Sequence, residues 1–137
     1  MVYLAGPITK GDLCHNINQA TAAFQALAQA GFAPMCPQWS CFSGGAFRMT
    51  VDATEAVYGR ATAAGCGLSH QHWIDLDLEF VERSDAVLRL PGASTGADME
   101  VCHATAWGIP VFHSVAEVIA WRWRDEPERG RDVTRSA

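Results

Sequence analysis

A serine and a glutamate stand six residues apart where an apolar run gives way to a loop of small residues. The run 87–90 ends at Pro91-Gly92, and the segment beyond it carries first Ser94 and then Glu100. A hydroxyl can donate a hydrogen bond to a phosphate oxygen. A carboxylate can attack or stabilise a sugar carbon that is losing its leaving group. The spacing therefore suggests an anion site beside a reacting centre, at a turn from strand to helix.

A second acidic side chain could complete such a site. Asp75 and Asp77 precede the apolar run, and Asp77 would face the same rim as Glu100 if their segment is a helix packed on a sheet. Two carboxylates beside a bound sugar suit cleavage at the anomeric carbon, because one can attack while the other handles a proton. Each also fits an ordinary role, Glu100 near the positive end of a helix and the two aspartates on a solvated face. On the residues alone both interpretations stay open.

Two loops could offer backbone N–H groups to an anion, and a helix dipole would add to the attraction at the second. The predicted substrate-binding residues are Gly6, Pro7, Ile8 and Thr9 in the first loop and Ser94, Thr95, Gly96 and Ala97 in the second. The alternative is that Ser94 or Thr95 is an ordinary helix cap, with Thr95 and Asp98 as a capping box.

Alternating strands and helices are expected to position these loops. Short apolar runs predict strands at 2–5, 32–36, 85–90 and 109–112. Helical spacing predicts helices at 16–30, 73–83, 96–107 and 115–124, and a short one around 52–62. The first helix is expected to begin at a capping box of Asn16 and Gln19, and Tyr3 is expected to be a core side chain.

This alternation predicts an α/β fold. We expect a three-layer αβα sandwich with a flavodoxin-like parallel sheet of four to five strands in the order 2-1-3-4. Residues 1–124 would form one domain and 125–137 a charged, frayed tail. Ligands of such sheets bind at the carboxyl ends of the strands, which is where both predicted loops fall.

The composition of the chain argues against several classes of binding partner. A net charge of −5 with a single lysine argues against binding to a nucleic-acid polymer. No apolar run approaches the roughly 20 residues that span a bilayer, and nothing at the N-terminus resembles a signal peptide. Five cysteines without a CxxC pair favour a reducing, cytoplasmic location. A zinc site could be imagined, but the spacings fit no ligand pattern, so we predict neither metal nor cofactor. The ligands of the imagined zinc site would be Cys36, Cys41, Cys66, His70 and His72.

Three stretches, taken in their order and spacing, resemble the nucleoside 2-deoxyribosyltransferase superfamily. They are YLAGPIT at 3–9, DLDLEFVERSDAVLRLPG at 75–92 and STGADMEVCHATAWGIPVF at 94–112. The resemblance covers residues 2–36 and 73–113, and leaves 38–70 unmatched.

The resemblance implies a role for each acidic residue. The family has an aspartate eight residues before the aspartate that opens the third strand, and counting back from Asp85 gives Asp77. Its glutamate nucleophile lies in a Gly-x-x-x-Glu helix start, which corresponds to Glu100 after Gly96. Six residues earlier, transferases that act on free nucleosides carry an acidic residue, whereas the monophosphate hydrolases carry serine. Ser94 therefore implies the nucleoside 5′-monophosphate N-glycosidase branch, because a hydroxyl donates to a phosphate that a carboxylate would repel.

The implied function is hydrolysis of the N-glycosidic bond of a (deoxy)nucleoside 5′-monophosphate, with release of free base and sugar 5-phosphate. Glu100 would attack C1′, Asp77 would position or protonate the leaving base, and Ser94 would hold the phosphate. A homodimer or tetramer is expected, since relatives complete their sites across subunits. The alternatives are a deoxyribosyltransferase that exchanges bases and a nucleotide-binding sensor without turnover. A phosphoribohydrolase motif is discounted, because Glu100 lies one residue too far along and the second glycine is missing.

Overall fold

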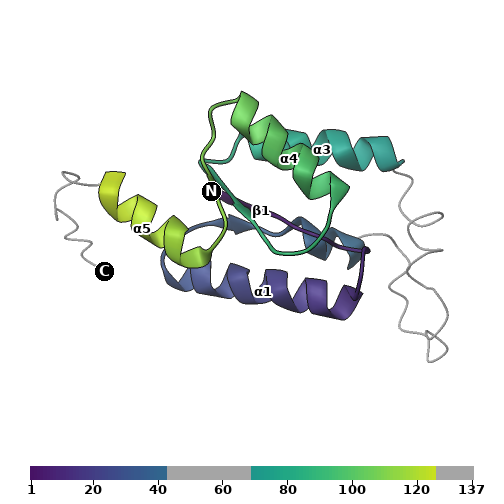
Figure 1. The fold of residues 1–137 in the computed structure, drawn as a ribbon, viewed down its shortest axis with the longest axis horizontal. Coiled ribbons are helices and arrows are strands. Elements are labelled where there is room, and N and C mark those ends of the chain that lie inside the picture. The colour runs from purple at the N-terminus through teal and green to yellow at the C-terminus, as the bar shows by residue number, and fades with distance from the viewer. Residues whose placement is uncertain (43–68, 126–137) are drawn as a thin grey trace, which may run out of the picture.

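The computed structural model describes residues 1–42 and 69–125, and its centre is a four-stranded parallel sheet in the order β2-β1-β3-β4 (Figure 1). The strands are β1 (Val2–Ala5), β2 (Pro34–Met35), β3 (Ala86–Arg89) and β4 (Val111–Phe112). β1 pairs with β3 along its whole length, from Val2 opposite Ala86 to Ala5 opposite Arg89. The predicted α/β class, the parallel sheet and its strand order are thus confirmed.

Helices cover both faces of the sheet and give the three predicted layers. They are α1 (Leu13–Gln29), α3 (His70–Glu82), α4 (Thr95–Ala106) and α5 (Val115–Asp125), with a 3₁₀ helix η1 at Pro37–Phe42. α3 and α4 lie side by side on one face, and α1 and α5 lie on the other (Figure 1). No helix in the described ranges 1–42 and 69–125 is long and apolar enough to cross a membrane.

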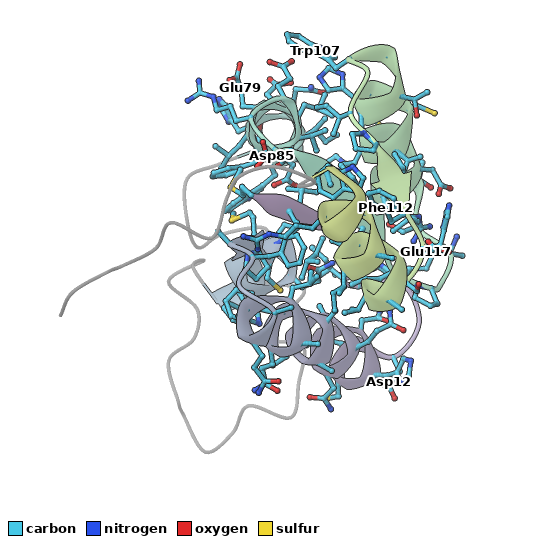
Figure 2. All side chains as sticks on the ribbon, turned by 90° about the vertical axis from the view of Figure 1, so that its left-hand side faces the viewer. Asp12, Glu79, Asp85, Trp107, Phe112 and Glu117 are labelled. Atoms are coloured by element: carbon cyan, nitrogen blue, oxygen red, sulfur yellow. The ribbon has the colours of Figure 1, made fainter. Side chains whose placement is uncertain are left out.

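α1 begins one turn earlier than expected, and the predicted capping box at Asn16 and Gln19 is wrong. The N-cap is Asp12, whose Oδ1 accepts a hydrogen bond from His15 N at 3.0 Å. Figure 2 shows Asp12 at the start of this helix. Asn16 and Gln19 consequently lie inside α1, where their amide groups are free to bind other parts of the chain.

The other boundaries shift by a few residues. α3 starts at His70 because Ser69 and His72 form a reciprocal capping box, whereas apolar spacing alone placed the start at residue 73. β2 and β4 are shorter than the predicted strands 32–36 and 109–112, since only the residues that pair with β1 and β3 join the sheet. The helix expected around 52–62 lies outside the described residues, as does the predicted tail beyond residue 125.

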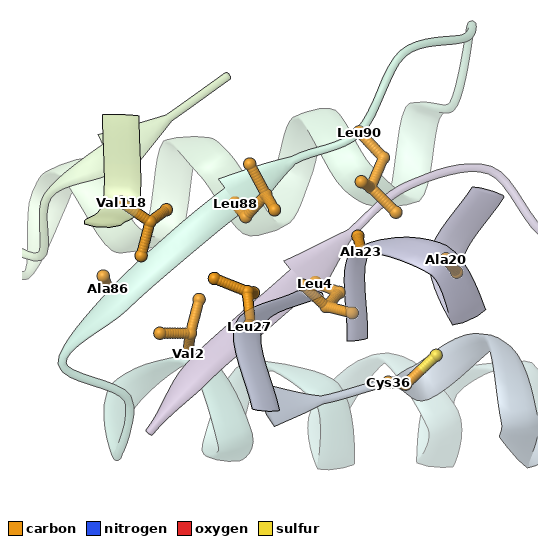
Figure 3. Close-up of a cluster of buried hydrophobic side chains, with 10 residues drawn as sticks. All are labelled: Val2, Leu4, Ala20, Ala23, Leu27, Cys36, Ala86, Leu88, Leu90 and Val118. Atoms are coloured by element: carbon orange, nitrogen blue, oxygen red, sulfur yellow. The ribbon is translucent and has the colours of Figure 1, made fainter. Parts of the chain in front are cut away.

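β1 is buried on both faces, and its alternation sends neighbouring side chains to opposite layers. Val2 and Leu4 pack towards α1 and α5, as Figure 3 shows for this part of the core. Tyr3 and Ala5 point the other way, into a cluster with residues of α3 and α4. Tyr3 is fully buried, so the expectation of a core side chain is confirmed, but its hydroxyl is carried towards the α3–α4 layer.

The turn after β1 leaves no room for a side chain at Gly6. A Cβ there would lie 2.9 Å from Leu90 Cβ and 3.2 Å from Gln38 Nε2. We expect Gly6→Ala to lower the free energy of unfolding by ~1–3 kcal/mol, as overpacking does elsewhere, measured by urea denaturation.

Gly96→Ala is the matched control for this change. The nearest atom to a Cβ at Gly96 would be Ser94 Oγ at 4.0 Å, and alanine is a better helix former than glycine. This variant should be as stable as the wild type or slightly more so. Equal decreases in the free energy of unfolding of both variants would show that the close packing around Gly6 does not cause the destabilisation.

Candidate active site

Tyr3 connects the central strand to the two carboxylates that the sequence singles out. Its hydroxyl donates a hydrogen bond of 2.9 Å to Oε1 of Glu100, in the second turn of α4. Asp77, on α3, lies close enough to interact with the same hydroxyl through both charge and hydrogen bonding. A buried tyrosine hydroxyl needs such partners, because leaving it unpaired is costly. Asp77 and Glu100 thus converge on one point between the sheet and its α3–α4 layer.

Asp75 lies on a different side of α3. It is exposed and accepts a hydrogen bond of 2.8 Å from Gln71 Nε2, one turn earlier on the same helix. Asp77 is instead partly buried beside Tyr3. Position 77 rather than 75 therefore provides the second carboxylate of the cluster.

Burial keeps this acidic cluster from being fully ionised at neutral pH. It raises the pKa of Glu100 to about 8, with a further increase from the negative charge of Asp77 and an opposing effect from the Tyr3 hydrogen bond. Burial likewise raises the pKa of Asp77 to about 6, again opposed by Tyr3. The same burial, with the two negative charges, moves the pKa of Tyr3 far above its ordinary value, so the hydroxyl keeps its hydrogen.

Burial thus raises the pKa of both carboxyl groups, so that the pair holds a proton around neutral pH. Because they interact, their titrations belong to the pair rather than to either residue alone. A pair with one ionised and one protonated carboxyl can supply a nucleophile or base together with an acid. Acid-assisted glycosidic cleavage needs one carboxyl group in each of these two forms.

Arg89 is a site residue that the sequence reasoning missed. It is the last residue of β3, its side chain is only 13% exposed, and it pairs with Asp98 in the first turn of α4 at 3.0 Å. It also donates to the Leu90 carbonyl and, at 2.9 Å, to the Gly92 carbonyl. Its positive charge lowers the pKa of Glu100 and so partly offsets the effect of burial. The available signal was a charged residue inside the apolar run 87–90.

The second predicted loop contains a helix cap. Ser94 is the N-cap of α4, and its Oγ accepts a hydrogen bond of 3.1 Å from Ala97 N. The hydroxyl hydrogen is not consumed by this bond, so Ser94 can still donate to an anion. Thr95 and Gly96 carry the first two amides of the helix, which have no carbonyl partner within it.

Two details of the second loop bear on the predictions. The amide of Ala97 donates to Ser94 Oγ and only 2% of the Ala97 surface is exposed, and its assignment to the substrate stays a prediction. The alternative capping box between Thr95 and Asp98 is not formed. Asp98 instead pairs with Arg89.

The first predicted loop offers fewer donors than expected. Pro7 is wrong as an amide donor because proline has no N–H. It lies against Gly92, where a Cβ would approach Pro7 Cγ to 2.9 Å. Gly6 is buried against Leu90 and Gln38. Ile8 is partly buried and Thr9 is exposed, and their assignment to the substrate stays a prediction.

Within residues 1–42 and 69–125, no group of three histidine, cysteine or acidic side chains is arranged to hold a metal ion. Among the imagined zinc ligands, Cys36 Sγ lies 3.4 Å from Gln38 Oε1, and the Nδ1 atom of His72 accepts from Ser69 N at the start of α3. Cys66 and the side chain of Cys41 lie outside the described part of the chain.

Comparisons of the chain with protein-family models, curated proteins and solved structures found no match. The family resemblance therefore rests on the motifs themselves, and the function that it implies is treated below as a proposal.

The buried carboxyl of Glu100 makes stability depend on pH. Between 4.5, the ordinary pKa of a glutamate, and about 8, the folded protein keeps a proton that the unfolded chain releases. The contribution of Glu100 to stability therefore falls as pH rises through this window. Glu100→Gln removes that titration. We expect its free energy of unfolding to rise relative to the wild type by ~2 kcal/mol between the two ends of the window.

Urea unfolding at several pH values across this window measures the effect. Glu79→Gln is the matched control, since Glu79 lies exposed on the outer side of α3 (Figure 2) and pairs with Arg83 one turn later. Its difference from the wild type should stay nearly constant with pH. If the difference in the free energy of unfolding between Glu100→Gln and the wild type also stayed constant with pH, the Glu100 carboxyl would ionise normally.

Proposed function

We propose that this protein is an N-glycosidase that hydrolyses the N-glycosidic bond of a (deoxy)nucleoside 5′-monophosphate. The supporting observation is the Tyr3-centred pair of Glu100 and Asp77, with raised pKa values, next to the turn that carries Ser94. Two carboxyl groups of opposite protonation state beside an anion-binding turn match the requirements of a phosphorylated sugar with a leaving group at C1′.

In the proposed reaction Glu100 attacks C1′ and the bond from C1′ to the base nitrogen breaks. The electron pair of that bond leaves with the base, which takes a proton from Asp77. The product of this step is a glycosyl ester of Glu100. A water molecule then adds to C1′, gives its proton to the Asp77 carboxylate and releases Glu100 and the sugar 5-phosphate. Since Oε1 of Glu100 accepts from Tyr3, the other carboxylate oxygen is assigned to the attack.

The phosphate would bind where α4 begins. Ser94 can donate its hydroxyl hydrogen outward, and the amides of Thr95 and Gly96 point from the positive end of the helix dipole. Arg89 adds a cation at the same end of α4, held in place by Asp98. These groups are donors or cations, which favours a phosphate over an unphosphorylated 5′-hydroxyl at this position.

The reactive form has Glu100 ionised and the proton of the pair on Asp77. Tyr3 favours this form, because its hydrogen bond stabilises the carboxylate of Glu100 more than the acid. Assembly into a dimer or tetramer belongs to the same proposal. Three large apolar side chains exposed on or beside α3 and α4 are compatible with it, namely Leu76, Met99 and Trp107.

A screen of all nucleoside monophosphates, scored chromatographically for free base, tests the proposal. Glu100→Gln should reduce release of the base by about 10³-fold or more, and Asp77→Asn by about 10²-fold, because they remove the nucleophile and the acid. Asp75→Asn is the matched control on the same helix and should retain wild-type activity.

Three outcomes would redirect the proposal. Exchange of a labelled base into the nucleotide without net hydrolysis would indicate a transferase. Saturable nucleotide binding with no product, unaffected by Glu100→Gln, would indicate a sensor. Activity that survives Glu100→Gln would contradict the assigned nucleophile.

The shared proton predicts the pH profile. If Asp77 protonates the leaving base, the singly protonated pair is the reactive form, and kcat/KM should be bell-shaped with flanks near the pKa values of about 6 and about 8. Initial rates with the best substrate across this range measure the profile. A rate that only rises with pH through the upper flank would show that Asp77 positions the base as a carboxylate and does not protonate it.

A further inference from the structure

Asn16 ties α1 to the loop after β1. Its side chain is 6% exposed, and its Nδ2 donates to the carbonyl oxygens of Ile8 at 3.0 Å and Lys10 at 2.8 Å. Both amide hydrogens are therefore used, and both hold backbone of the same loop. A buried amide with two such bonds restricts the path that residues 8–10 can take.

Gln19, one turn further along α1, ties the helix to the loop after β3. Its Nε2 donates to the Pro91 carbonyl at 3.0 Å. Residues three apart on a helix lie on the same face, so one face of α1 contacts both strand-end loops.

The loop after β3 is also held from its other side. The carbonyls of three successive residues, Leu90, Pro91 and Gly92, each accept a hydrogen bond from a side chain, two of them from Arg89 and one from Gln19. Gly92 has a φ of +110° and lies against Pro7. The two loops are therefore in direct contact, and the position of each constrains the other.

We infer that Asn16 and Gln19 are positioning residues that set the geometry of the paired loops 6–10 and 90–94. The consequence for substrate rests on the proposed function. Ser94 lies two residues after Gly92, the last of these hydrogen-bonded carbonyls, so a loop displaced from α1 would misplace the phosphate contacts. Tyr3, Asp77 and Glu100 lie on β1, α3 and α4 rather than on the loops. Loss of the hydrogen bonds from Asn16 and Gln19 to the loops should therefore weaken substrate binding and leave bond cleavage nearly intact.

Gln19 is the better position to test, because it is only partly buried while Asn16 is buried. Gln19→Ala removes the donor, and Gln19→Glu puts a carboxylate against the Pro91 carbonyl at nearly the same shape. Gln25→Ala and Gln25→Glu are the matched controls, since Gln25 is exposed on the same helix.

Amide NMR relaxation of the full chain without ligand gives the first measurement. In both Gln19 variants the order parameters of residues 92–94 should fall, and those of residues 8–10 should fall with them through the contact between Pro7 and Gly92. The amides of α4 should be unchanged, as should the whole pattern in the Gln25 variants. Unchanged loops in the Gln19 variants would overturn the inference whether or not the protein hydrolyses nucleotides.

Steady-state kinetics with the best nucleotide gives the second measurement. The Gln19 variants should raise KM about 3- to 10-fold, the loss expected for one hydrogen bond, with kcat within about twofold of the wild type. A lower kcat at unchanged KM would overturn the assignment of Gln19 to substrate positioning. Absence of turnover in the wild type would instead contradict the proposed function, and the relaxation data would still decide whether α1 sets the loop geometry.

Discussion

The hydrogen bond from the Tyr3 hydroxyl to Glu100 is the interaction on which the site depends. β1 pairs with β2 on one side and β3 on the other, so Tyr3 cannot move without breaking the centre of the sheet. Its fixed hydroxyl donates to Glu100 and interacts with Asp77, so it links acidic side chains from two different helices. Without that donor, two carboxyl groups facing each other in a buried position would repel or take up protons. The sheet thus determines where the acids meet, and the acids determine what chemistry is available there.

Such a cluster costs stability. Three polar groups are removed from water where an apolar core would pack with less penalty. Clustered carboxyl groups with strongly shifted pKa values are typical of catalytic sites. Here the shifts come mainly from burial and act on residues of two helices that also share the His103–Glu82 contact of 2.8 Å. The α3–α4 layer is therefore held together at more than one point.

The loops around the cluster are held by side chains rather than by their own turns. Asn16, Gln19 and Arg89 provide donors to backbone carbonyls of residues 8, 10 and 90–92. Two of these donors come from α1, which lies on the opposite face of the sheet from α3 and α4. The turn that carries Ser94 and the acidic pair are thus supported from different layers. Under the proposed function, substitutions should therefore alter substrate binding and bond cleavage separately.

Local patterns in the sequence predict the α/β class, the parallel sheet and its strand order, because apolar runs, helical spacing and turn residues act over a few positions. The choice of the carboxylates at 77 and 100 comes from the family resemblance, since the residues alone leave the role of each acidic side chain open. The packing of the chain shows in addition that Tyr3 contacts Glu100, that Arg89 lies beside these acids, that Ser94 is a helix cap, and that Asn16 and Gln19 hold loops instead of starting a helix. Tyr3 and Glu100 are separated by 97 positions, and Gln19 and Pro91 by 72. A polar side chain can satisfy its hydrogen bonds nearby or far away at similar energy, so the chain's packing, not its local pattern, selects the partner.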